Sequence, residues 1–164
     1  MDLERRVFIS FQNPENLDAR RRAVQDAVIR KVEELDLQPE MFFNAGTAAS
    51  LAWSLQNAID IIRRCVGAVI LAFPRWTVSG PNGEEYRLVS EYAQIEGGIA
   101  TALRVPILML AERGVVDRGI TWTGAGHPIL YMPQDASPEW LGGDAFRHRF
   151  GVGRIRLRRA QTFS

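Results

Sequence analysis

Residues 66–73, Val-Gly-Ala-Val-Ile-Leu-Ala-Phe, form an almost wholly apolar run that decides the fold. The run is far shorter than the ~20 residues of a membrane helix. Its apolar residues are continuous rather than alternating, which is typical of a strand covered on both faces in a parallel sheet. Further short apolar or aromatic runs at 6–10, 40–44, 106–111 and 128–132 predict four more strands.

Segments with helical periodicity lie between these strands, at about 15–35, 50–64 and 88–103. This alternation predicts an α/β fold, a flavodoxin-like three-layer sandwich with a central parallel sheet. Ligands bind such sheets beyond the carboxyl ends of the strands. The segment 74–85, which we expect to be a long loop after the central strand, therefore lies where a functional lid would be.

Length and composition set the broad class of protein. The chain has 164 residues, 46% of them hydrophobic, which suits one domain with a substantial core and excludes global disorder. We predict an α/β domain over 1–135 and a basic C-terminal extension over 136–164, packed on the same domain. The N-terminus lacks a signal-peptide core, so we expect a cytoplasmic protein with no membrane partner.

The near-zero net charge of +1 is a cancellation between two parts of the chain. Residues 1–146 carry 14 basic and 19 acidic side chains, whereas 147–164 carry six arginines and no acidic residue. The balance argues against direct nucleic-acid binding by the protein as a whole. We expect the arginine-rich tail to dock on its own body or on a neighbouring subunit.

Several chemistries have little support in the sequence. The single cysteine, Cys65, excludes a disulfide framework and a cysteine-built metal site, and we predict no metal site. Cys65 precedes a buried strand and is interpreted as an inert core thiol, although a relay to His127 or His148 stays open. The turn 80–83 lacks the Lys-Ser/Thr of a phosphate-binding loop.

The third predicted helix carries the candidate chemistry. Its buried stripe is expected to consist of Leu88, Tyr92, Ile95, Ile99 and Leu103. Glu96 and Glu91 lie at the two edges of this stripe, where partial desolvation raises a carboxyl pKa. Gly97 and Gly98 each cost about 1 kcal/mol in a helix, which indicates close approach by another backbone or a ligand. Tight helix packing beside a solvated surface glutamate is the alternative interpretation.

Three segments resemble one family. Residues 96–100, Glu-Gly-Gly-Ile-Ala, followed by Arg-Val-Pro-Ile-Leu at 104–108, resemble the Glu-x-Gly-x-Ala and Lys-Pro-Val-Ile segment of bacterial TIR-like domains and of the related nucleoside 2-deoxyribosyltransferases. Residues 7–11 and 55–73 resemble the opening strand, and the second helix with the central strand, of TIR domains. The resemblance covers 6–132. It departs from the family in two ways, because the usual aspartate after the first strand and the usual Trp-Cys before the glutamate are not evident.

The resemblance implies an NAD glycohydrolase that cleaves the nicotinamide–ribose bond, with NAD as substrate and no cofactor. It assigns catalysis to Glu96, with Glu91 as the alternative. It implies substrate binding by residues near the strand ends: Ser10, Phe11, Phe43, Asn44, Trp76 and Tyr92. Either Trp53 or Trp76 is expected to stack on a ring of the substrate.

The resemblance also implies a cellular role and alternatives to it. Such effectors act in bacterial antiphage defence, as homo-oligomers formed through TIR–TIR contacts, with a sensor domain or partner protein responding to a cyclic nucleotide. One alternative is an ADP-ribose cyclase, or a ribosyl or deoxyribosyl transferase, on the same scaffold. The other is a non-catalytic module that binds a nucleotide or another TIR surface.

Overall fold

A five-stranded parallel sheet forms the centre of the molecule. The computed structural model describes residues 5–42 and 53–150, with side chains up to residue 147. The strands, in chain order, are β1 (Arg6–Ser10), β2 (Gln38–Glu40), β3 (Gly67–Ala72), β6 (Ile107–Glu112) and β7 (Ile129–Met132). They pair in the order β2-β1-β3-β6-β7. Numbered within the sheet alone this order is 2-1-3-4-5, that of flavodoxin-like folds, so the predicted fold class is confirmed.

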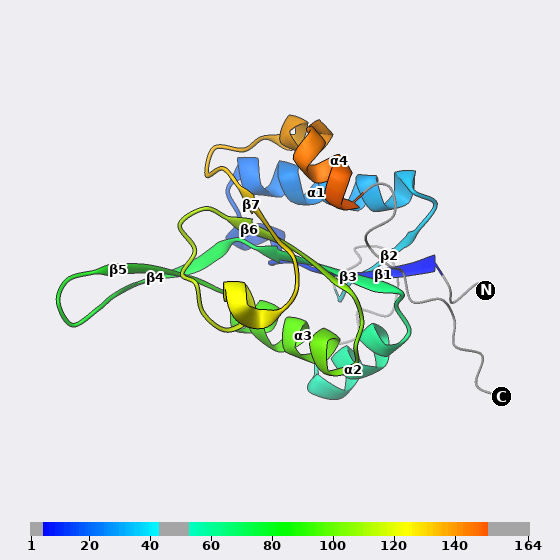
Figure 1. Ribbon diagram of the computed structural model, residues 1–164, viewed down its shortest axis with the longest axis horizontal. Coiled ribbons are helices and arrows are strands. Elements are labelled where there is room, and N and C mark those ends of the chain that lie inside the picture. The colour runs from blue at the N-terminus through cyan, green and yellow to red at the C-terminus, as the bar shows by residue number, and fades with distance from the viewer. Residues whose placement is uncertain (1–4, 43–52, 151–164) are drawn as a thin grey trace.

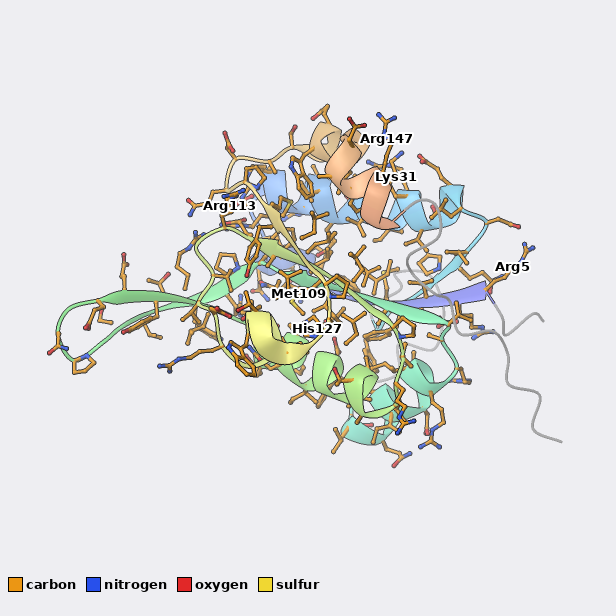
Figure 2. The ribbon with its side chains drawn as sticks, viewed as in Figure 1. Arg5, Lys31, Met109, Arg113, His127 and Arg147 are labelled. Atoms are coloured by element: carbon orange, nitrogen blue, oxygen red, sulfur yellow. The ribbon has the colours of Figure 1, made fainter. Side chains whose placement is uncertain are left out.

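Helices cover both faces of the sheet (Figure 1). On one face lie α1 (Ala19–Glu34) and α4 (Asp144–Phe150), and on the other lie α2 (Leu55–Arg63) and α3 (Glu91–Ala102). All residues of β3 and β6 are buried, as continuous apolar strands require. Figure 2 shows Met109 of β6 in the interior of the molecule, where its side chain is fully buried.

Each long helix begins at a polar cap. The side chains of Asp18, Ser54 and Ser90 accept hydrogen bonds from backbone N–H groups in the first turns of α1, α2 and α3. Short 3-10 helices lie in the connections of the described chain: η2 (Pro14–Asn16), η3 (Gly119–Thr121), η4 (Thr123–Ala125) and η5 (Pro138–Gly142). Within the described residues, no helix combines the length and apolar character that crossing a membrane requires.

Residues after β7 pack onto the α1 face. Ala136, Leu141 and Phe146 are buried in the same hydrophobic cluster as the inward side chains of α1. The rest of the predicted basic extension, 151–164, lies outside the described residues.

Two predicted connections differ from the structure. The strand expected at 40–44 is instead β2, at Gln38–Glu40, and 43–44 lie outside the described residues. The long loop expected at 74–85 is wrong. This segment forms an antiparallel hairpin of β4 (Pro74–Ser79) and β5 (Glu85–Val89) that projects from the body (Figure 1). Its turn contains Gly83 at φ +85°, a backbone conformation that glycine adopts without strain. The strands on either side of the turn are rich in β-favouring residues, which explains why the segment forms a hairpin.

The predicted buried face of α3 is wrong in part. The residues that α3 buries are Ala93, Glu96, Gly97 and Ala100, whereas Tyr92 and Ile95 of the expected stripe are exposed. The small side chains let the helix approach the sheet and η3 closely. Ile99 and Leu103 of the expected stripe are only partly buried and pack at the margin of the core.

The paired glycines of α3 have different surroundings. A Cβ added at Gly97 would lie 2.4 Å from Cγ1 of Ile120, whereas one added at Gly98 would meet nothing within 4 Å. The neighbour that requires Gly97 is therefore a buried side chain, not another backbone or a ligand as the sequence indicated.

Alanine substitutions at these two positions should have opposite effects on stability. We expect Gly97→Ala to lower the free energy of unfolding by about 1–2 kcal/mol, because the new methyl group displaces a packed side chain. Gly98→Ala should raise it by about 0.5–1 kcal/mol through helix propensity. Urea denaturation of both variants measures the difference. Equal shifts in the same direction would contradict the packing argument.

Candidate active site

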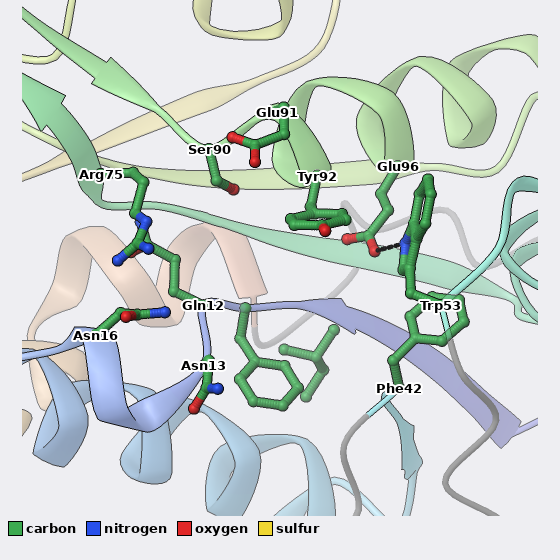
Figure 3. A pocket seen from close by; sticks show the side chains of 12 residues that line it. Gln12, Asn13, Asn16, Phe42, Trp53, Arg75, Ser90, Glu91, Tyr92 and Glu96 are labelled. Atoms are coloured by element: carbon green, nitrogen blue, oxygen red, sulfur yellow. Dashed lines mark hydrogen bonds between the residues drawn. The ribbon is translucent and has the colours of Figure 1, made fainter.

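A cavity of about 230 Å³ opens at the carboxyl edge of the sheet, where β1 and β3 lead to connections on opposite faces. This switch point is where flavodoxin-like folds bind ligands. The cavity is lined by aromatic, polar and charged side chains from both halves of the chain (Figure 3). The aromatic residues are Phe11, Phe42, Trp53 and Tyr92, the polar ones are Gln12, Asn13, Asn16 and Ser90, and the charged ones are Arg75, Glu91 and Glu96; Ile9 also lines the cavity.

Glu96 is a buried carboxylate in this cavity, with 4% of its surface exposed. The indole N–H of Trp53 donates to its Oε1 at 2.9 Å, and the hydroxyl of the buried Ser10 also donates to it. Burial raises the pKa of Glu96 to about 7, and the two donated hydrogen bonds oppose that rise. Near neutral pH the carboxyl group is therefore present in both protonation states.

Aromatic rings surround the Glu96 end of the cavity. Trp53 meets Tyr92 edge to face at a centroid distance of 5.0 Å, and Phe42 lies 6.4 Å from Trp53. Tyr92 is 46% exposed, so part of its surface is open to an incoming ligand. Such surfaces bind planar bases by stacking and edge contacts.

The other end of the cavity is polar. Gln12 is buried, and its Nε2 donates to the carbonyl oxygen of Phe73 at 2.7 Å. Its Oε1 is a buried acceptor for which the described residues provide no donor. Arg75 is the one basic side chain that lines the cavity among the described residues, and its guanidinium carbon lies 4.8 Å from the ring centroid of Trp76.

Glu91, the alternative catalytic candidate, also lines the cavity but differs from Glu96 in its surroundings. It is exposed, and its Oε2 accepts a hydrogen bond from the indole of Trp76 at 3.3 Å. Trp76 itself is half-exposed on β4 and is not among the residues that line the cavity. Trp76 therefore contacts two residues that line the cavity, Glu91 and Arg75, without lining it itself.

The structure brings together most of the residues named from the sequence. Phe11, Tyr92, Glu91 and Glu96 line the cavity, and Ser10 bonds to Glu96. Phe43 and Asn44 lie outside the described residues.

Sequence reasoning did not assign a role to several lining residues: Gln12, Asn16, Phe42, Arg75 and Ser90. The polar segment 12–16 directly after the first strand was a usable signal, because that position faces the ligand in this fold class. Arg75 lies in the segment 74–85, which was expected to have a functional role, but nothing in the sequence distinguishes this arginine within it. Trp53 was expected to stack on a ring, and its hydrogen bond to Glu96 was not foreseen.

Of the residues of the other candidate chemistries, Cys65 and His127 lie elsewhere, and the side chain of His148 is outside the described residues. Cys65 is buried, its thiol donates to the Ile61 carbonyl, and burial raises its pKa to about 12, so it is not a nucleophile near neutral pH. The imidazole Nε2–H of His127 donates to the carbonyl of Ile120 and is not part of the cavity (Figure 2). Over residues 5–42 and 53–147, no group of three or more His, Cys, Asp or Glu side chains is placed to hold a metal ion.

A second buried carboxylate anchors the hairpin that carries Arg75. Glu112 ends β6, is fully buried, and accepts hydrogen bonds from Arg20 and Arg21 of α1 and from Arg87 of β5 at 2.7–2.9 Å. Burial by itself raises the pKa of Glu112, but the arginine hydrogen bonds outweigh it and leave the pKa lowered. The Glu112 carboxylate thereby connects α1, β6 and the hairpin through its hydrogen bonds to the three arginines.

Comparisons with known proteins give no family. The sequence matches no protein-family model and no curated protein. A CMP N-glycosidase of Clostridium botulinum is similar in structure, with 20% identity, a TM-score of 0.48, and coverage of 84% of this chain and 95% of that one. The NanR protein of Vibrio vulnificus complexed with ManNAc-6P has 13% identity and a TM-score of 0.44, over 87% of this chain and 42% of that one. At these scores neither likeness bears on function, and the fold class rests on the strand order of the sheet.

Proposed function

We propose that this protein hydrolyses the N-glycosidic bond of a nucleotide, and that its substrate is NAD, cleaved between nicotinamide and ribose. One observation carries the proposal. A single buried carboxylate, Glu96, is held by two hydrogen-bond donors inside an aromatic-lined cavity at the ligand-binding edge of the sheet.

The chemistry needs one carboxylate rather than two. The bond between C1′ of the ribose and the nicotinamide nitrogen breaks, and its electron pair leaves with nicotinamide. The ribose then resembles an oxocarbenium ion, which an adjacent carboxylate stabilises electrostatically. Nicotinamide departs as a neutral molecule, so no acid is required. Water forms the new bond to C1′ and releases a proton, which gives ADP-ribose.

The cavity suits a cationic base. In NAD the nicotinamide ring is a pyridinium cation, which is attracted both to aromatic rings and to carboxylates. Trp53 and Tyr92 lie beside Glu96, and Glu91 adds a second carboxylate to the lining. A neutral base also stacks on the rings but gains neither the cation–π attraction nor the attraction to the carboxylates, so this lining favours a pyridinium nucleotide. Arg75 at the polar end is suited to a phosphate group of the same molecule.

The pH dependence of the wild-type enzyme tests the proposal. We expect purified protein to release nicotinamide and ADP-ribose from NAD in equal amounts. The kcat/KM should rise about tenfold per pH unit below pH 7 and level off above it, because the pKa of Glu96 is about 7 and its carboxylate is the active form. A bound pyridinium cation favours the ionised form of Glu96, so the acid limb of the kcat profile should lie at lower pH than that of kcat/KM. Quantitative chromatography over pH 5–9 measures both.

CMP and cytidine in the same assay separate the alternatives. A neutral base leaves more readily when protonated, so cleavage of CMP with activity that falls above pH 7 would make Glu96 an acid and contradict the choice of NAD. No cleavage of NAD or CMP at any pH would contradict the glycosidase proposal. Nucleotide binding by calorimetry would then favour a non-catalytic module. The antiphage role, the homo-oligomer and the cyclic-nucleotide-responsive partner stay predictions from the resemblance.

A further inference from the structure

Trp53 lies close to Glu96 although the two residues are far apart in the chain. It directly precedes Ser54, the residue that caps α2, whereas Glu96 is on α3. Figure 3 shows the indole directed at the carboxylate, with the Nε1 to Oε1 hydrogen bond of 2.9 Å dashed. This bond therefore couples the start of α2 to the candidate catalytic group.

The indole ring is held by its neighbours. Tyr92 meets it edge to face at 5.0 Å between centroids, and the ring of Phe42 is tilted against it at 6.4 Å between centroids. A ring packed in this way keeps its N–H in one direction. Only small movements of the carboxylate are then compatible with the hydrogen bond.

The indole also differs chemically from the second donor. An indole N–H can only donate, so it favours the ionised carboxylate over the protonated one. The hydroxyl of Ser10 can donate to a carboxylate or accept from a carboxylic acid. Both donors lower the pKa of Glu96, and Ser10 lowers it more than Trp53 does, but only the Trp53 N–H lacks a lone pair that could accept a hydrogen bond from the protonated carboxyl.

The other charged and titratable groups around the cavity do not replace this donor. Arg75 comes from β4, and Glu91 and Tyr92 come from α3. The hydrogen bonds of Glu96 go to Ser10 of β1 and to Trp53, and the indole partner of Glu91 is Trp76. The rise in the pKa of Glu96 that burial causes is thus opposed by two uncharged hydrogen-bond donors.

We propose that Trp53 is a positioning residue, whose indole N–H holds Glu96 ionised and aimed into the cavity and so sets the lower pH limit of activity. This role rests on the proposed function of Glu96. The physical link can be measured without any substrate, so its test is independent of whether NAD is the substrate.

The test replaces the indole by a ring that lacks the donor. In Trp53→Phe, the Glu96 carboxyl, followed by carbon-13 NMR and assigned through Glu96→Gln, should titrate about one pH unit higher, a tenfold change in proton affinity. The acid limb of kcat/KM should move by the same amount, with about a tenfold loss at pH 6 and little loss at pH 9. A purely structural role would lower activity at all pH values alike.

The same substitution at Trp76 is the matched control. That indole donates to Glu91, so Trp76→Phe should leave the midpoint of Glu96 unchanged. A shift of Glu96 below about 0.3 pH unit in folded Trp53→Phe would overturn the inference, as would an equal shift in Trp76→Phe.

A measurement on the unaltered protein covers the case in which Trp53→Phe does not fold. The indole N–H resonance of Trp53 should move with pH along the titration curve of Glu96. An indole resonance that does not follow Glu96 would overturn the inference. Coupled titrations in a protein that cleaves no nucleotide would leave the Trp53–Glu96 link standing and refute the proposed function alone.

Discussion

Glu96→Gln is expected to lower the kcat for NAD cleavage by at least about 10²–10³-fold, the loss typical when one electrostatic stabiliser of a developing charge is removed. Glutamine keeps the shape of the side chain, and its amide oxygen still accepts from the Trp53 indole. It carries no negative charge for the ribose cation. Nicotinamide release at pH 8, where the wild-type carboxyl is ionised, gives the largest contrast.

Glu91→Gln is the matched variant. Glu91 is exposed on the first turn of the same helix, bonded to Trp76, and a charge in contact with water interacts more weakly with a ligand. We expect this variant to lose far less activity. The opposite result, activity surviving in Glu96→Gln and disappearing in Glu91→Gln, would transfer the catalytic role to Glu91.

The stability of Glu96→Gln separates lost chemistry from lost folding. The pKa of Glu96 is raised by burial to about 7 from 4.5, so the folded state binds this proton more tightly than the unfolded chain does. The contribution of Glu96 to the free energy of unfolding is therefore largest below about pH 4.5, falls as the pH rises to 7, and is lost above that. Glutamine has no such dependence, so the variant should be about 2–3 kcal/mol more stable than wild type at pH 8 and equal to it near pH 4. Urea denaturation at both pH values measures this.

Glu112→Gln should be the most destabilising single change in the molecule, lowering the free energy of unfolding by about 3–5 kcal/mol. The carboxylate is fully buried and accepts from three arginines, so its neutralisation leaves their charges close together, with Asp18 as a partner for Arg21 alone. The loss is a large part of the 5–15 kcal/mol that stabilises a typical domain. It also releases Arg87, which holds the β4–β5 hairpin to the body.

An exposed ion pair provides the control for Glu112. Lys31 and Glu34 pair on the surface of α1, where solvent weakens their attraction, so Glu34→Gln should change stability by less than about 0.5 kcal/mol. The pKa of Glu112 is lowered, so its contribution is present above pH 4.5 and is lost as pH falls further. The difference between wild type and Glu112→Gln should therefore shrink in acid. Equal unfolding midpoints for the two proteins at pH 7 would contradict the cluster's role.

The sequence was sufficient for the layered fold and for the candidate carboxylate. Continuous apolar runs separated by helical segments predict a parallel sheet, and residues 67–72 and 107–112 are indeed buried central strands. Periodicity placed both Glu96 and Glu91 at the edges of one helix stripe, and Glu96 was preferred only through the resemblance of residues 96–100 to a family segment. The hairpin was not anticipated in the same way, since its two short strands form a sheet of their own outside the central one, apart from a single bridge between Arg87 and Val115.

The tertiary structure decided which side of α3 faces the sheet. Periodicity ranks positions by hydrophobicity, so it assigned Tyr92 and Ile95 to the core. In the folded protein the size of each side chain decides which positions can face the sheet. The close approach to Ile120 and the sheet requires the small residues Ala93, Gly97 and Ala100 instead. Glu96 shares this small-residue face, which is why it is buried.

The sequence by itself therefore determined the strands and helices of the central layers and two acidic candidates on one helix, because both depend on neighbouring positions along the chain. Only the tertiary structure decided the chemical environment of Glu96. Ser10, Trp53, Arg75 and Glu96 come from four separate segments and meet because parallel strands end at the same edge of the sheet. Burial and donated hydrogen bonds, which together place the pKa of Glu96 near 7, are properties of that meeting and of no single segment.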